Sequence, residues 1–287
     1  MEYYAEHSRF SDPGPHERWL RGTPGDVESL RDIASGLVFH YWGNEEIARR
    51  GIAAERYEEI NLRYASDMFG RLRELDPSPL GARRREADRI LGCCRDSTLL
   101  LVSLARHHGI PARSRVGFAS YLVPGWHLDH VVAEVFVAGE WRLVEPQFDR
   151  DHAAVDVLDV PRTSFLTAPE AWLATRAGTL DPTRFAVSPD LPEPFLRGFP
   201  YLHHNLVLDL AALNKHEMIL WDIWGALTTA DHVPEHDAHA ADILAQSLNN
   251  PTIPQSAEAF TNDRYQVPGT IVTIPPTTNL PREVTLR

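Results

Sequence analysis

The most apolar segment of the chain runs from Cys94 to His108. Its apolar residues spread over most of the circumference of a helix, which is typical of a helix buried in a protein core. These residues are Leu99, Leu100, Leu101, Val102, Leu104 and Ala105. Gly109 ends the segment, and Ile110-Pro111 turns the chain. The pattern therefore predicts one long buried helix.

Three short segments with the composition of strands follow this helix: Arg113–Ala119, His130–Val137 and Trp141–Val144. The connection Ala138-Gly139-Glu140 between the last two contains glycine and has the length of a hairpin turn. A buried helix that packs on an antiparallel sheet is an α+β core. We therefore expect an α+β fold with this helix and these strands at its centre.

Helical patterns come before and after this core. One apolar-periodic run opens at Asp26 and continues through Phe39, and a second runs from about Ala53 to Leu75. Beyond the core we predict helices around Val207–Leu213, Ile219–Leu227 and Ala238–Leu248, and a strand at Thr270–Ile274. The proposed division is an N-terminal helical segment (1–80), a core (81–150) and a mainly helical, substrate-shaping region (151–287), which either stands apart or shares one domain with the core.

Charge and composition exclude several kinds of partner. The chain has 28 Lys+Arg against 40 Asp+Glu, a net charge of −12, and a pI near 5.6. An acidic chain has no general attraction for phosphate backbones or anionic membranes, so we expect neither nucleic acid nor a membrane as a partner. No apolar run approaches the ~18 residues of a membrane span, and no secretion signal is seen. We expect a cytoplasmic protein.

The two cysteines, Cys93 and Cys94, are neighbours, so they cannot join distant parts of the chain. At the first turn of a helix a cysteine meets unpaired N–H groups and the positive end of the helix dipole, and both favour the thiolate. Those N–H groups also lie where an oxyanion develops during attack on a carbonyl. Cys94 is therefore the candidate nucleophile. Cys93 points about 100° away around the helix, and we expect it to pack in the core.

The predicted hairpin supplies the other groups of a thiol relay. A histidine beside the thiolate can accept and return a proton, and a carboxylate on the next strand can fix the tautomer of that histidine. By strand alternation His130 shares a face with Glu134, and Glu145 shares a face with Leu143. The register between the two strands cannot be read from the sequence, so contact between His130 and Glu145 is an inference.

Four motifs together resemble the transglutaminase-like superfamily of thiol enzymes. They are Gly92-x-Cys94, the interval from that cysteine to the Gly109-Ile-Pro-Ala-Arg113 segment, His130-x-x-x-Glu134-Val135 and Trp141-x-x-x-Glu145-Pro146. They occur in the family's order and close to its spacing, over residues 92–149. The resemblance implies a papain-like α+β core and a Cys-His-acid triad.

Carried over residue by residue, the resemblance places the nucleophile on Cys94 and the histidine on His130. The family's acid is normally the aspartate of a Trp-x-x-x-Asp-Pro motif, and Glu145 stands in that position here. This departure leaves Asp149 as the alternative orienting acid. A second departure is that the family's aromatic residue after the histidine is absent, since Val131 follows His130.

Other polar residues have a structural and a functional interpretation. Asp96, in the first turn of the helix, is expected to cap it rather than to act in catalysis. His40-Tyr41-Trp42 is predicted at the end of an early helix, where it packs or donates to an oxyanion. The group His232, His236 and His239 has spacing suited to a metal ion, but a solvated polar face is the favoured interpretation, as it is for His203-His204. Trp221 and Trp224 are expected on one buried helix face.

The resemblance implies an enzyme that forms an acyl-thioester on Cys94, from a small-molecule or carrier-protein-bound acyl substrate. Water as acceptor makes a protease or amidase, an amine makes a transglutaminase-type acyltransferase, and an internal carbanion makes a Dieckmann cyclase. The favoured hypothesis is the family's Dieckmann group, which off-loads polyketide–peptide thioesters as tetramates or pyridones. None of these reactions needs a metal or an organic cofactor, so we expect none. The alternative from another class is a non-catalytic binding module with the same fold.

Overall fold

The computed structural model describes residues 1–42 and 44–287, with the side chains of residues 44–46 left aside. The chain forms two compact units. The first unit contains Met1–Ser114 and Val132–Val160, and the second contains Arg115–Val131 and Pro161–Arg287. The division of the chain into segments 1–80, 81–150 and 151–287, expected from the sequence, stays a prediction. Each unit is described by itself below.

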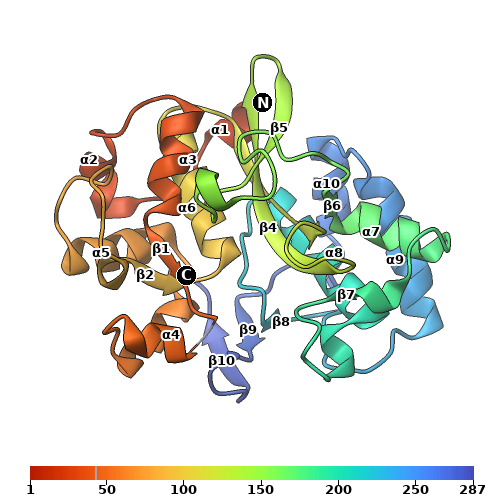
Figure 1. The fold of residues 1–287 in the computed structure, drawn as a ribbon. Coiled ribbons are helices and arrows are strands. Elements are labelled where there is room, and N and C mark those ends of the chain that lie inside the picture. Colours follow the sequence, from red (N-terminus) through yellow and green to blue (C-terminus); the bar gives the residue numbers. More distant parts are fainter. Residues whose placement is uncertain (43) are drawn as a thin grey trace. The chain divides into compact units, whose positions relative to one another are not determined.

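The central sheet has the strand order β5-β4-β3-β6, and β7 also pairs with β4. Its strands are β3 (Ala112–Ala119), β4 (His127–Val137), β5 (Glu140–Val144), β6 (Phe165–Thr167) and β7 (Phe185–Ala186). β3 and β4 each contribute residues to both units. The predicted strands are thus confirmed, and with the helices described next they make an α+β fold (Figure 1).

The predicted hairpin joins β4 and β5 in the first unit. Ala138 and Gly139 both have positive φ, 53° and 91°, as a tight hairpin turn of this twist requires. The two strands pair antiparallel from Ala133↔Val144 to Val137↔Glu140, and this register puts Glu134 opposite Leu143. Directly opposed residues share a face of the sheet. The side chains of Glu134 and Leu143 therefore lie on the same face.

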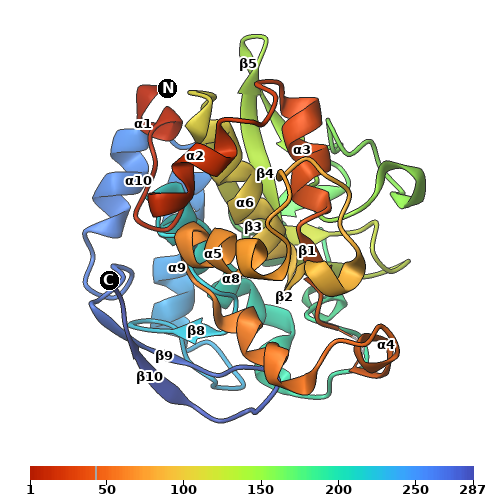
Figure 2. The ribbon, with the colours of Figure 1, turned by 90° about the vertical axis from the view of Figure 1, so that its left-hand side faces the viewer.

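The first unit is built around the predicted buried helix, α6 (Cys94–His107), whose apolar side chains are fully buried. The other elements are α1 (Glu2–Ala5), α2 (Glu17–Leu20), α3 (Val27–Ser35), β1 (Val38–His40), α4 (Asn44–Arg49), α5 (Ala65–Leu75) and β2 (Ile90–Gly92). α3 and α5 pack on α6. β1 and β2 lie side by side as a parallel pair, which Figure 2 shows near α5.

Two expectations about the first unit need correction. The helix begins at Asp26 as predicted, where the Asp26 carboxylate caps it by accepting from the Ser29 N–H at 2.8 Å, but it ends at Ser35 rather than Phe39. The following residues form β1, because their backbone pairs with β2, so His40 follows a strand and not a helix. The run from Ala53 is divided into a 3₁₀ segment, 54–61, and α5.

The second unit packs four helices near the sheet: α7 (Ala168–Arg176), α8 (Gly198–Leu213), α9 (Glu235–Leu248) and α10 (Ile253–Phe260). α7, α8 and α9 contact one another, and α8 also contacts β7. A separate three-stranded sheet has the order β10-β9-β8, with β8 (Asp222–Ile223), β9 (Thr270–Thr273) and β10 (Arg282–Thr285). The predicted helices around Val207–Leu213 and Ala238–Leu248 and the strand from Thr270 are confirmed.

The helix predicted at Ile219–Leu227 is wrong, because this segment holds the short strand β8 and turns. Trp224 is buried and its Nε1–H donates to the carbonyl of Tyr265 at 3.0 Å. Gly225 has φ +53°, and a Cβ there would lie 2.1 Å from the carbonyl oxygen of Arg264. These contacts with a distant segment override the local helical pattern, and Trp221 and Trp224 do not share a helix face.

Candidate functional site

Cys94 is the first residue of α6, in the first unit. The chain leaves β2 at Gly92, passes the N-cap residue Cys93 and enters the helix. The thiol of Cys94 therefore lies at the positive end of the dipole of a fourteen-residue helix. Cys94 is 5% exposed, so this positive helix end faces a largely water-free environment.

Asp96 holds the start of this helix in place, as the sequence predicted. One oxygen of its carboxylate accepts from the Cys93 N–H at 2.8 Å, and the other accepts from the Arg95 guanidinium at 2.9 Å. Arg95 in turn donates to the carbonyl of Arg63 at 2.7 Å. Asp96 and Arg95 are both buried, and burial raises the pKa of Asp96. The carboxylate caps the helix that carries Cys94.

The structure explains the glycine two residues before Cys94. A Cβ on Gly92 would lie 2.6 Å from an Asp96 carboxylate oxygen and 3.0 Å from Val38. Neither distance leaves room for a methyl group, and Val38 belongs to the paired strand β1. Gly92 is therefore needed so that the capping carboxylate can lie directly over the backbone.

Cys93 differs from its neighbour in chemistry. Its thiol is buried at the N-cap, and the hydrogen bond to Cys94 together with burial holds the pKa of Cys93 well above its usual range. A thiol that stays protonated is a poor nucleophile. A thiol that donates a hydrogen bond to an adjacent sulfur also stabilises negative charge on that sulfur.

His130 lies on β4 in the second unit and is 2% exposed. The ring of Tyr121 meets the imidazole edge-to-face, with 6.0 Å between the centroids. The preceding residue, Asp129, accepts a hydrogen bond from the Tyr201 hydroxyl at 2.7 Å. The imidazole therefore has an aromatic neighbour, although the residue after it is not aromatic.

Glu145 and Asp149 differ sharply in burial. Glu145 follows β5 and is fully buried. Its Oε1 accepts from the Gln147 N–H at 2.8 Å. Its own N–H donates to the Val157 carbonyl, and its carbonyl accepts from the Arg31 guanidinium, both at 2.8 Å. Asp149 is exposed and precedes the short 3₁₀ segment 150–152. A buried carboxylate is held in one position, whereas an exposed one is solvated.

Glu134, which belongs to the His130-x-x-x-Glu134 motif, has a structural partner. Its carboxylate accepts from the Arg113 guanidinium at 2.7 Å, and the pair is buried. The guanidinium also lies over the rings of Tyr4 and Trp141, at 5.1 and 4.4 Å from their centroids. Arg113 and Glu134 thus join two of the motifs found in the sequence.

The backbone of β4 fixes the direction of these side chains. His130 stands four positions before Glu134 in β4, and the two residues belong to different units. Within the first unit, the register with β5 puts Leu143 on the face of Glu134, and Glu145 follows Leu143 by two positions. Cys94 and Glu145 belong to the first unit and His130 to the second, so the assembly of the three into one relay is a proposal.

His40 lies closer to the start of α6 than the sequence could indicate. It pairs with Gly92 in the register of β1 and β2, and the Tyr41 N–H donates to the Gly92 carbonyl at 3.0 Å. The Nδ1 of His40 accepts from the Trp42 N–H at 3.2 Å, so a neutral ring carries its proton on Nε2. This proton is a candidate donor beside the helix that carries Cys94.

The other histidine groups do not form a metal site in the part of the chain that is described, where no group of three metal-ligating side chains occurs. His232 and His236 are exposed and pair with Asp231 and Asp237, at 2.9 and 3.1 Å. The prediction of a solvated polar face is wrong for His203 and His204. Burial lowers the pKa of each to about 4, so both are neutral near pH 7.

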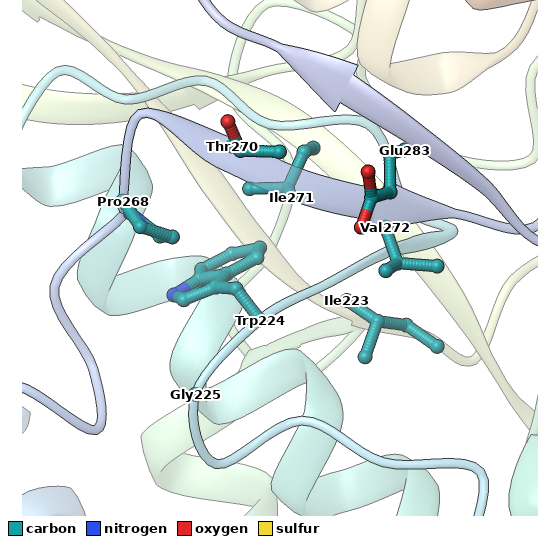
Figure 3. A pocket seen from close by; sticks show the side chains of 8 residues that line it. All are labelled: Ile223, Trp224, Gly225, Pro268, Thr270, Ile271, Val272 and Glu283. Carbon is teal, nitrogen blue, oxygen red and sulfur yellow. The ribbon is translucent and has the colours of Figure 1, made fainter.

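A surface cavity of about 200 Å³ lies in the second unit, along the strands β8, β9 and β10 (Figure 3). Trp224 and Ile271 are its buried lining residues, and the exposed Glu283 also lines it. Cys94, His130, Glu145 and Asp149 do not line it. Outside Gly43, which is not described, no helix has the length and apolar character to cross a membrane.

Comparison with known proteins identifies one family. A sequence model of the transglutaminase-like superfamily matches residues 52–146, a segment that contains Cys94, His130 and Glu145. Among solved structures, the chain is similar to the crystal structure of a candidate cysteine protease from Cytophaga hutchinsonii, with 18% identity and a TM-score of 0.33. The match covers 57% of this chain and 44% of that chain. A search of curated proteins finds no match.

The glycine at position 92 can be tested directly. In Gly92→Ala the new methyl group displaces the Asp96 carboxylate, so the free energy of unfolding should fall by about 1–3 kcal/mol and alkylation of Cys94 should slow. Urea denaturation and iodoacetamide kinetics measure the two effects. Gly81→Ala is the control, because a Cβ there meets only ordinary contacts, at 3.7 Å or more. Equal behaviour of the two variants would contradict the role given to Gly92.

Proposed function

Because residues 52–146 belong to the transglutaminase-like superfamily, we propose that this protein is a cysteine-dependent acyl-transfer enzyme with Cys94 as its nucleophile. The observation that carries the proposal is the position of Cys94 at the first turn of the buried helix α6, held there by the Asp96 cap. The positive end of the helix dipole lowers the energy of a thiolate, and N–H groups at a helix start can donate to an oxyanion.

The reaction begins with attack of the Cys94 thiolate on the carbonyl carbon of an acyl substrate. The carbonyl oxygen takes the negative charge, and the N–H groups at the start of α6 stabilise it. His130 then gives its proton to the leaving group, the carbon–leaving group bond breaks, and an acyl-thioester remains on Cys94. His130 returns to the neutral form and can act as the base in the second half of the reaction.

Glu145 is the proposed orienting acid. It is buried, it follows Leu143 by two positions, and Leu143 lies on the face to which His130 points by strand alternation. A fixed carboxylate stabilises an imidazolium and one tautomer of the ring. Asp149, which is exposed, has no comparable constraint. Burial thus favours the residue in the motif position over the alternative.

The proposed acceptor is a carbanion within the substrate itself, which makes the enzyme a Dieckmann cyclase. His130 removes a proton from the activated α-carbon, the carbanion attacks the thioester carbonyl, the ring closes and the Cys94 thiolate leaves. The burial of Cys94 supports this acceptor, because a site with little water protects an acyl-thioester from hydrolysis. A carrier protein would deliver the acyl chain as a thioester. No metal ion or organic cofactor takes part.

Two other outcomes remain distinct from this proposal. With water or an amine as acceptor, the same acyl-thioester would make the enzyme an amidase, a protease or a transglutaminase. A non-catalytic module with this fold would have a cysteine that no electrophile labels quickly. The following three experiments separate these alternatives.

Thiol labelling tests whether Cys94 is a nucleophile. At neutral pH, one equivalent of iodoacetamide label should be lost in Cys94→Ala and retained in Cys93→Ala, because the raised pKa of Cys93 keeps its thiol protonated. Intact-protein mass spectrometry gives the stoichiometry. Slow and equal labelling of both cysteines would favour the non-catalytic module.

The choice of acid can be tested with two isosteric variants. Glu145→Gln should lower the rate of acyl transfer by a factor on the order of 10²–10⁴, because the amide no longer stabilises the imidazolium. Asp149→Asn should leave the rate unchanged, and it serves as the matched control. Rates are measured with an acyl thioester of N-acetylcysteamine. The reverse pattern would assign the role to Asp149.

The acceptor can be identified from the product. We expect a β-ketoacyl-aminoacyl thioester to be converted into a tetramate, which liquid chromatography with mass spectrometry distinguishes from the free acid. Cys94→Ala gives the background of spontaneous cyclisation. A product that is only the free acid would show a hydrolase, and an amide formed with an added amine would show a transglutaminase.

A further inference from the structure

Tyr201 makes a contact that the mechanism above does not use. It lies in the first turn of α8, it is 4% exposed, and its hydroxyl donates to the Asp129 carboxylate at 2.7 Å. The ring stacks on His204, 5.7 Å away at 9°, and meets Phe118 edge-to-face at 6.3 Å. A tyrosine enclosed in this way holds its hydroxyl in one place. All of these residues belong to the second unit.

The helix that carries Tyr201 is itself anchored to the sheet. Two turns further along α8, the Asp209 carboxylate accepts from the Arg115 guanidinium at 2.9 and 3.1 Å and from the Val116 N–H at 2.8 Å. Asp209 is fully buried and Arg115 nearly so. Residues 201 and 209 are about 80° apart around the helix, two turns from each other. The Arg115–Asp209 pair holds α8 against β3 and so fixes the position along β4 that the Tyr201 hydroxyl reaches.

Asp129 directly precedes His130, at a point where the pairing of β4 changes. β4 pairs with β7 at His127 and Leu128, and with β5 from Ala133 onward. His130 lies between these two registers. β4 is also hydrogen-bonded to β3, and a side-chain contact adds to this backbone pairing beside His130. The hydrogen bond from Tyr201 to Asp129 is such a contact, one residue from the imidazole.

We propose that Tyr201 is a positioning residue that, through its hydrogen bond to Asp129, sets the place of the His130 imidazole. This inference rests on the proposed function, in which His130 serves the Cys94 thiol. Successive side chains of a strand point to opposite faces, so Asp129 and His130 point away from each other. Tyr201 therefore acts through the backbone and does not touch the substrate. A small displacement of a catalytic group is enough to slow a reaction strongly.

The test is the pH profile of Cys94 alkylation by iodoacetamide, which reports how well an imidazolium stabilises the thiolate. In Tyr201→Phe the rate at neutral pH should fall between about tenfold and a hundredfold. The acid limb of the profile should move to higher pH, because a displaced imidazolium lowers the pKa of the thiol less. Tyr265→Phe is the matched control: it also removes one hydroxyl from a buried tyrosine of the second unit, and its profile should equal that of the parent.

Variants of Asp129 separate the hydrogen bond from general packing. Asp129→Asn keeps an oxygen that can accept from Tyr201, so it should lose less rate than Asp129→Ala. The double variant with Tyr201→Phe and Asp129→Ala should be no slower than Asp129→Ala alone, because both changes break the same bond. A merely structural effect would lower the melting temperature without moving the pH profile.

The outcomes distinguish this inference from the proposed function. If His130→Ala moves the profile and Tyr201→Phe does not, the positioning role of Tyr201 is wrong and the thiol relay stands. If His130→Ala leaves the profile unchanged, the relay itself is wrong, and the inference fails with it. Additive losses in the double variant would also contradict a shared hydrogen bond.

Discussion

The first unit depends on one buried carboxylate. Asp96 accepts the N–H of Cys93 and pairs with the guanidinium of Arg95, which also reaches back to the carbonyl of Arg63. This network caps α6 at the residue before Cys94 and requires Gly92 to lack a side chain. A buried charge with its partners in place is costly to move, because each displaced partner leaves a desolvated group behind. The position of the candidate nucleophile follows from this constraint.

In the second unit, buried polar contacts again lie beside a candidate catalytic residue, the base His130. The Arg115–Asp209 pair holds α8 against the sheet, and the Tyr201–Asp129 hydrogen bond connects that helix to the residue before His130. Both contacts are polar and largely buried, so they specify a geometry that apolar packing alone leaves adjustable. Cys94 directly follows Cys93, whose N–H Asp96 accepts, and His130 directly follows Asp129, which accepts from Tyr201. We infer that each candidate catalytic residue takes its position from this neighbour.

The motifs within the matched segment 52–146 contain catalytic candidates and structural residues. Glu134 stands in the His130 motif, but its carboxylate is held by Arg113, whose guanidinium lies over Trp141 of the following motif. All three residues belong to the first unit, where Arg113 and Glu134 are buried and Trp141 is half-buried. Glu145 is fully buried, and its Oε1 accepts from the Gln147 N–H. Its burial and its place in the Trp141 motif make its carboxylate the proposed partner for an imidazole.

The sequence by itself determined the elements whose signal is local. Periodicity predicted α6, alternation and a glycine turn predicted the hairpin of β4 and β5, and the motif spacing predicted Cys94 as the nucleophile. Only the tertiary structure decided that Ile219–Leu227 is not helical, that His40 lies beside Gly92, and that Glu145 is buried while Asp149 is exposed. Strand pairing and burial depend on contacts between residues far apart in the chain, and a local sequence pattern does not specify which distant residues will be in contact.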